Sequence, residues 1–133
     1  MKKNNNIYLF LLTLFILSCS ISPSRAASNE KELFVVAQRA FEDGFYDVSL
    51  RYVAQLFQEF PKPERYVETK LLEGQCYFFK KEYLKAFNVF KELVGKDSYR
   101  DASLFWLGET YLKSGDYDKA REQYRRVIAE FPS

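Results

Sequence analysis

A pattern of small, aromatic and apolar residues recurs three times after residue 30, and this recurrence constrains the fold more than any other feature. The last copy contains Leu104, Leu107, Gly108, Tyr111, Gly115, Tyr117, Ala120, Tyr124, Val127 and Pro132. The same places 34 residues earlier hold Lys70, Glu73, Gly74, Tyr77, Lys81, Tyr83, Ala86, Phe90, Leu93 and Ser98. A further 37 residues back they hold Leu33, Val36, Ala37, Ala40, Gly44, Tyr46, Ser49, Val53, Leu56 and Pro61. A period of this length indicates stacked structural repeats.

Each copy reads as two amphipathic helices around a short break. The predicted helices span residues 30–43, 46–60, 66–80, 83–95, 100–114 and 117–130. Gly44 and Gly115 suit the tight corner inside a copy, and Pro61 and Pro132 close a copy because proline cannot continue a helix.

Small residues occupy matching places in the two helices of each copy. They are Ala37, Gly74 and Gly108 in the first helices, and Ser49, Ala86 and Ala120 in the second helices. Small side chains let two helix backbones approach closely, while Tyr111 and Tyr124 fill space one turn away. We therefore predict helical hairpins that pack through these positions.

The sequence Leu-Gly-x-x-Tyr, followed by Ala, an aromatic residue and Pro, resembles the tetratricopeptide repeat. The resemblance covers residues 30–133 and is strongest in the third copy, LFWLGETYLKSGDYDKAREQYRRVIAEFP. The second copy departs from the pattern at Lys70 and Glu73, and the first at Ala37 and Ala40. The resemblance implies an all-α, right-handed α-solenoid of three helix-turn-helix repeats, at 30–63, 67–100 and 101–133. No capping helix follows the third repeat, so we expect either that the array continues beyond Ser133 or that its edge docks on a partner or a second copy.

Composition excludes several classes of function. The chain has no histidine, the commonest general base and transition-metal ligand. Removing Lys2, Lys3 and Arg25 from its 20 basic residues leaves 17 against 18 acidic ones. Such a near-neutral domain lacks the basic surface that nucleic-acid binding requires. We predict no enzyme activity, cofactor, metal site or nucleic-acid partner, and we predict Cys76 as a small core residue.

The first 26 residues have the features of an export signal. Two lysines precede an apolar run from Ile7 to Leu17, which as a helix would rise only about 16 Å, too short to cross a bilayer. Cleavage after Ala26 would give a soluble periplasmic protein. Alternatively, the residues before Cys19 resemble a lipobox, which predicts lipid attachment at Cys19 and anchoring in the envelope, most simply at the outer membrane. An uncleaved anchor is the third alternative.

In tetratricopeptide arrays the first helices line a concave groove, and the family's ligand contacts lie chiefly on one face of them. Carried onto this sequence, that face comprises Phe34, Gln38, Phe41, Leu71, Gln75, Phe78, Phe79, Phe105, Glu109 and Lys113. The alternative is that these phenylalanines complete the core. The Lys and Asn that clamp acidic tails in some relatives are replaced by Phe34 and Gln38, so an apolar peptide is the expected ligand.

Repeat and export signal together resemble bacterial envelope proteins: outer-membrane assembly lipoproteins and periplasmic proteins of the Tol–Pal system. The leading hypothesis is a scaffold or adaptor that holds a protein segment in its groove. The alternatives are a structural spacer of a longer protein, or the non-catalytic part of an enzyme whose catalytic domain lies beyond Ser133.

The lipid anchor makes a direct prediction. Cells that express the chain and are labelled with a radioactive fatty acid should incorporate label into the wild type and not into Cys19→Ala. An unlabelled wild-type protein would contradict lipid attachment.

Overall fold

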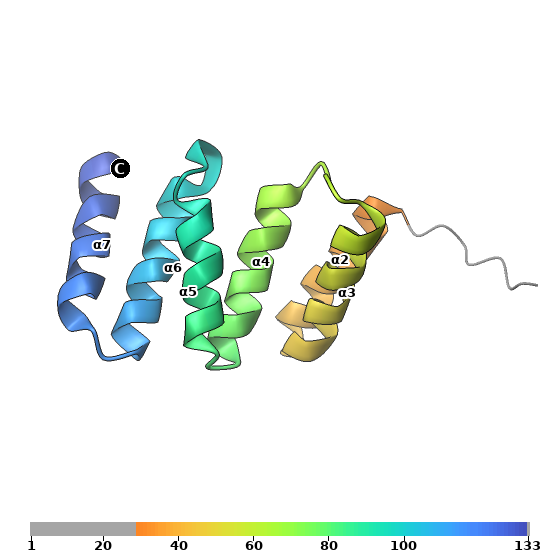
Figure 1. Ribbon diagram of the computed structural model, residues 1–133, viewed down its shortest axis with the longest axis horizontal. Helices are drawn as coiled ribbons and strands as arrows, with labels where there is room; N and C mark the ends of the chain where they lie inside the picture. The colour runs from red at the N-terminus through yellow and green to blue at the C-terminus, as the bar shows by residue number, and fades with distance from the viewer. Residues whose placement is uncertain (1–28, 133) are drawn as a thin grey trace, which may run out of the picture.

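The computed structural model describes residues 29–132, which form six α-helices and one short 3-10 helix (Figure 1). The helices are α2 (Glu30–Glu42), α3 (Tyr46–Glu59), α4 (Tyr66–Phe79), α5 (Tyr83–Leu93), α6 (Arg100–Lys113) and α7 (Tyr117–Glu130), and the 3-10 turn η1 spans Asp97–Tyr99. The predicted signal segment, with Cys19, lies outside the described residues.

The helices form three hairpins, α2–α3, α4–α5 and α6–α7, stacked in a row (Figure 1). Across residues 29–132 there is no strand, so the predicted all-α repeat fold is confirmed. Every helix begins where the sequence predicts and ends within two residues of its predicted end. No described helix has the length and apolar character needed to span a membrane.

The corners within the hairpins share one backbone conformation. Gly44 and Gly115 have positive φ angles of 79° and 83°, as their predicted corner positions require. At the same place in the second hairpin Lys81 has φ 63° and is the one described non-glycine residue with a positive φ. Its side chain is exposed, and its N–H donates to the carbonyl of Phe78 at 2.9 Å. The second hairpin therefore makes the same turn as the other two, although the left-handed conformation strains the backbone of Lys81.

A close contact between helix backbone and aromatic ring joins the two helices of a hairpin. A Cβ built on Gly108 would lie 2.6 Å from Cε1 of Tyr124, and one built on Gly74 would overlap the Phe90 ring. The first hairpin has Ala37 and Val53 at these two places, and both lie in one buried cluster. Compared with the other two hairpins, the first therefore has a larger residue on its first helix and a smaller one on its second helix. All the predicted small residues are buried, which confirms their packing role.

Buried polar side chains bond within their own helices. Thr69, Ser103 and Thr110 each donate a hydroxyl hydrogen to the carbonyl four residues earlier, at 2.6–2.7 Å. Cys76 is fully buried and contacts Ser49 Oγ through Sγ at 3.3 Å, so its predicted core position is confirmed. Among the described residues, no buried side-chain nitrogen or oxygen lacks a partner.

The glycine–ring contact predicts that Gly108→Ala destabilises the protein by about 1–3 kcal/mol, because the new methyl group meets the Tyr124 ring. In a Tyr124→Val background the same substitution should cost almost nothing, since alanine is the better helix former by about 1 kcal/mol. Urea unfolding of the four proteins measures this coupling. Additive effects would show that the contact does not limit the approach of α6 and α7.

The strained corner predicts that Lys81→Gly raises the free energy of unfolding by about 0.5–1 kcal/mol, the relief of left-handed strain less the added flexibility of the unfolded chain. Lys81→Ala is the control, because it removes the side chain and keeps the strain. Equal stability of the two variants in thermal unfolding would contradict this explanation.

Candidate groove between the first helices

The first helices of the three hairpins adjoin one another: α2 packs against α4, and α4 packs against α6. Each presents one side away from its own hairpin partner. The ten predicted ligand-contact residues lie on these three helices, and within each helix they are spaced i, i+4 and i+7 or i+8, so that they share one side. We call this surface the groove face.

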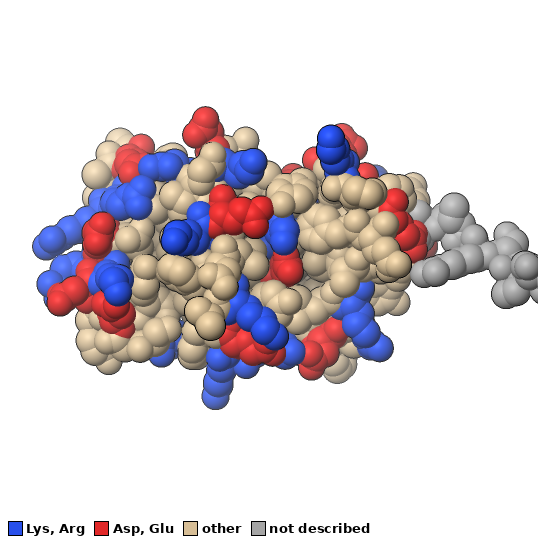
Figure 2. All heavy atoms as spheres, viewed as in Figure 1, with Lys and Arg blue, Asp and Glu red and all other residues tan. Residues whose placement is uncertain are grey.

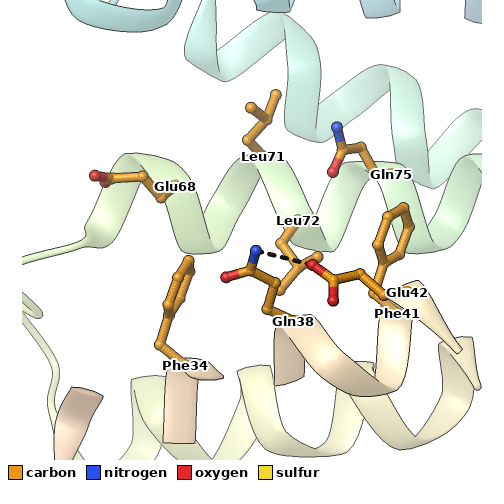
Figure 3. A pocket seen from close by; sticks show the side chains of 8 residues that line it. All are labelled: Phe34, Gln38, Phe41, Glu42, Glu68, Leu71, Leu72 and Gln75. Carbon is orange, nitrogen blue, oxygen red and sulfur yellow. Dashed lines mark hydrogen bonds between the residues drawn. The ribbon is translucent and has the colours of Figure 1, made fainter. Parts of the chain in front are cut away.

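A pocket of about 210 Å³ lies on the groove face between α2 and α4 (Figure 3). Its lining residues are Phe34, Gln38, Phe41, Glu42, Glu68, Leu71, Leu72 and Gln75. Five of these were predicted from the sequence: the three of the first hairpin, together with Leu71 and Gln75 of the second. The structure therefore brings half of the predicted residues to one hollow.

The pocket combines an apolar base with polar groups at its rim. Phe34 and Leu72 are buried, and Phe41 and Leu71 are half-buried. Gln38 is exposed, and its Nε2 donates to Glu42 Oε1 at 3.0 Å (Figure 3). This arrangement suits an apolar side chain below and the polar backbone of a ligand above.

The neighbouring residues Phe78 and Phe79 take different roles. Phe78 is only 8% exposed and packs edge-on against Trp106 with ring centroids 5.2 Å apart, so it belongs to the core. Phe79 is 45% exposed and stacks on Tyr46 at 5.5 Å. It also meets Phe41 edge-on at 5.7 Å, which connects it to the pocket residues of α2.

The three predicted residues of α6 do not line the pocket. Phe105 is 44% exposed and contacts the rings of Trp106 and Tyr124. Glu109 accepts a hydrogen bond of 2.6 Å from the Tyr124 hydroxyl, and burial and this bond raise the Tyr124 pKa. Lys113 is exposed at the end of α6. These side chains extend the groove face beyond the pocket.

The sequence prediction missed three residues of the pocket: Glu42, Glu68 and Leu72. Glu42 follows Gln38 by four residues and Glu68 precedes Leu71 by three. Both therefore lie on the sides of α2 and α4 that were predicted to contact a ligand. Extending each helical stripe by one turn would have found the two carboxylates. Leu72 lies next to Leu71, and helical spacing alone does not place it at the pocket.

The pocket carries negative charge. Glu42 and Glu68 line it, whereas no Lys or Arg does. The Arg65 guanidinium lies beside it, 5.3 Å from the centroid of the Phe34 ring. Burial, and after it the Glu68 carboxylate, raise the pKa of the Tyr99 phenol. Elsewhere charges of both signs are interspersed, as on the face in Figure 2.

Two other hollows on the described part of the chain contain none of the predicted ligand-contact residues. A hollow of about 400 Å³ lies over α5, α6 and the start of α7, and shares no residue with the first pocket. There Lys119 pairs with Asp116 at 2.6 Å and lies over the Tyr111 ring, so its charges are already matched. Within residues 29–132, no group of three His, Cys, Asp or Glu side chains is placed to hold a metal ion.

Comparison with known proteins agrees with the repeat pattern. Residues 102–133 match the model of the tetratricopeptide repeat. A search of curated protein sequences found no significant match. Tetratricopeptide repeats generally mediate protein–protein interaction. The matched residues include α7 and all of α6 except its first two residues, and the two preceding hairpins repeat their packing. The family match covers the third hairpin, and the two hairpins before it share its packing.

Proposed function

We propose that this protein is a scaffold or adaptor of the bacterial cell envelope that holds a segment of a partner protein on its groove face. The observation that carries the proposal is the pocket between α2 and α4, whose apolar base is edged by the amides of Gln38 and Gln75. A side chain of the partner would fill the pocket, and its backbone would bond the two amides.

Packed helices lie about 8–10 Å apart, and an extended chain rises about 3.3 Å per residue. About three residues of an extended segment therefore separate one first helix from the next. Gln38 and Gln75 occupy the same place in adjacent hairpins, so they suit backbone groups spaced in this way. The exposed rings of Phe79 and Phe105 offer further apolar contact on the same face.

The chemistry of the pocket disfavours an acidic partner. A carboxylate-rich tail needs cations on this face, and here Glu42 and Glu68 would repel it. An apolar segment has no such cost. We therefore favour an uncharged or cationic segment over an acidic one.

The cellular setting and the lack of catalysis are parts of the same proposal. The cationic, apolar start of the chain supports export, either to the periplasm or to a lipid anchor at Cys19. A chain without histidine has few means of acid–base catalysis near neutral pH, which supports a binding role.

The groove predicts that replacing both amides, Gln38→Ala with Gln75→Ala, weakens the binding of extended apolar peptides. Peptides of about nine residues, enough to cross three first helices, would be selected from a random library against the purified protein. Two lost hydrogen bonds should weaken binding about tenfold in fluorescence polarisation.

The matched control is Gln55→Ala with Gln58→Ala on α3. Gln55 bonds Glu59 at 2.8 Å as Gln38 bonds Glu42, but it lies away from the groove face. Equal binding by both double variants would rule out the groove as the binding site.

A further inference from the structure

We infer that the segment held in the groove is cationic: an apolar residue fills the pocket, and Lys or Arg residues beside it pair with Glu42 and Glu68. The inference rests on the proposed function and specifies its ligand. Its basis is the charge of the pocket, the position of each carboxylate on its helix, and the size of the hollow.

The two carboxylates come from different helices. Glu42 is the last residue of α2, and Glu68 lies in the first turn of α4. In Figure 3 Glu68 lies at the left of the labelled side chains and Glu42 on their right side, near Phe41, with Gln38 and Leu71 between them. A segment seated between the two helices therefore has a carboxylate within reach on either side.

Within residues 29–132 neither carboxylate forms an ion pair, although Arg65 lies beside the pocket over the Phe34 ring. Neither Glu42 nor Glu68 belongs to any of the ion pairs formed there. Away from the groove, by contrast, Lys80 pairs with both Asp47 and Glu82. The partner of Glu42 is the neutral amide of Gln38, which leaves its charge uncompensated.

Helix stability does not explain Glu42. The carboxyl end of a helix carries partial negative charge, so an acidic residue there is unfavourable. Glu68, in the first turn of α4, is favourably placed for its helix dipole, and Arg65 lies beside the same end of the pocket. We therefore expect Glu42 to contribute more than Glu68 to the attraction of a cation.

The hollow has room for one side chain. An apolar cavity of about 150 Å³ is large enough to hold benzene. The pocket of about 210 Å³ therefore admits a side chain such as leucine or phenylalanine. If the residues on either side of that side chain are Lys or Arg, the segment would bury the apolar side chain in the pocket and leave its cations at the rim.

The test uses three fluorescent peptides of equal length, each with a central leucine flanked by lysine, glutamine or glutamate. Partly exposed ion pairs contribute about 0.2–1 kcal/mol each. With two such pairs, the lysine peptide should therefore bind the wild-type protein about 2- to 30-fold more tightly than the glutamine peptide, and the glutamate peptide should bind most weakly. The preference should shrink as salt is raised to about 1 M.

In Glu42→Gln with Glu68→Gln, the lysine peptide should lose its advantage while the glutamine peptide binds as before. The control is Glu32→Gln with Glu122→Gln, which removes the same charge from exposed positions outside the pocket and should retain the preference.

The outcomes separate this inference from the proposed function. Binding that needs Gln38 and Gln75 but ignores the flanking charge would overturn the cationic ligand and leave the groove standing. A preference for lysine that survives loss of both carboxylates would also overturn it. If none of the three peptides binds, the inference and the proposed peptide groove both fail.

Discussion

The contact between a glycine on the first helix and an aromatic ring on the second determines how closely the two helices of a hairpin approach. At Gly74 and Gly108 the ring of the second helix occupies the space that a side chain would need. Interiors are packed too tightly to admit an extra methyl group without movement. The first hairpin has Ala37 and Val53 at these two places, so a larger residue on the first helix faces a smaller one on the second, and both are buried in one cluster.

This packing decides which side of each first helix is left for function. Leu33 and Ala37 face inward and are buried, as are Leu104 and Leu107 of the third hairpin. Most residues between them point to other sides of the helix, because a helix presents different faces at successive positions. Phe34 is the exception, since it also packs in the buried cluster of Leu33 and Ala37. The groove face is therefore what remains of α2, α4 and α6 once the hairpins have formed.

Much of the fold was predictable because the repeat carries its own signals. Glycine at a corner and small residues at a fixed period allow few arrangements, and the helix ends agree with prediction to within two residues. Lys81 was the exception, since nothing local in the sequence marks a lysine as left-handed. Its conformation follows from the same turn that Gly44 and Gly115 make.

The candidate site was less predictable, because it depends on contacts between hairpins. Phe78 and Phe79 are adjacent and chemically identical, and Trp106 meets both rings edge-on, yet Phe78 is 8% exposed and Phe79 is 45% exposed. Helical spacing indicates only the side of a helix, and the neighbouring hairpin decides which ring it covers. The two carboxylates of the pocket were overlooked for a related reason: each becomes informative only when α2 and α4 lie together.

Apolar contact and charge would contribute differently to recognition on this face. Burial of a side chain in the pocket supplies affinity but little direction, because the hydrophobic effect depends on area and not on orientation. Glu42 and Glu68 add a requirement that apolar contact cannot impose, since an acidic segment would place like charges together at both ends. The groove would thus select its ligand mainly by repelling acidic segments. In this account the uncompensated charge of Glu42 costs helix stability when the groove is empty and favours binding when a cation arrives.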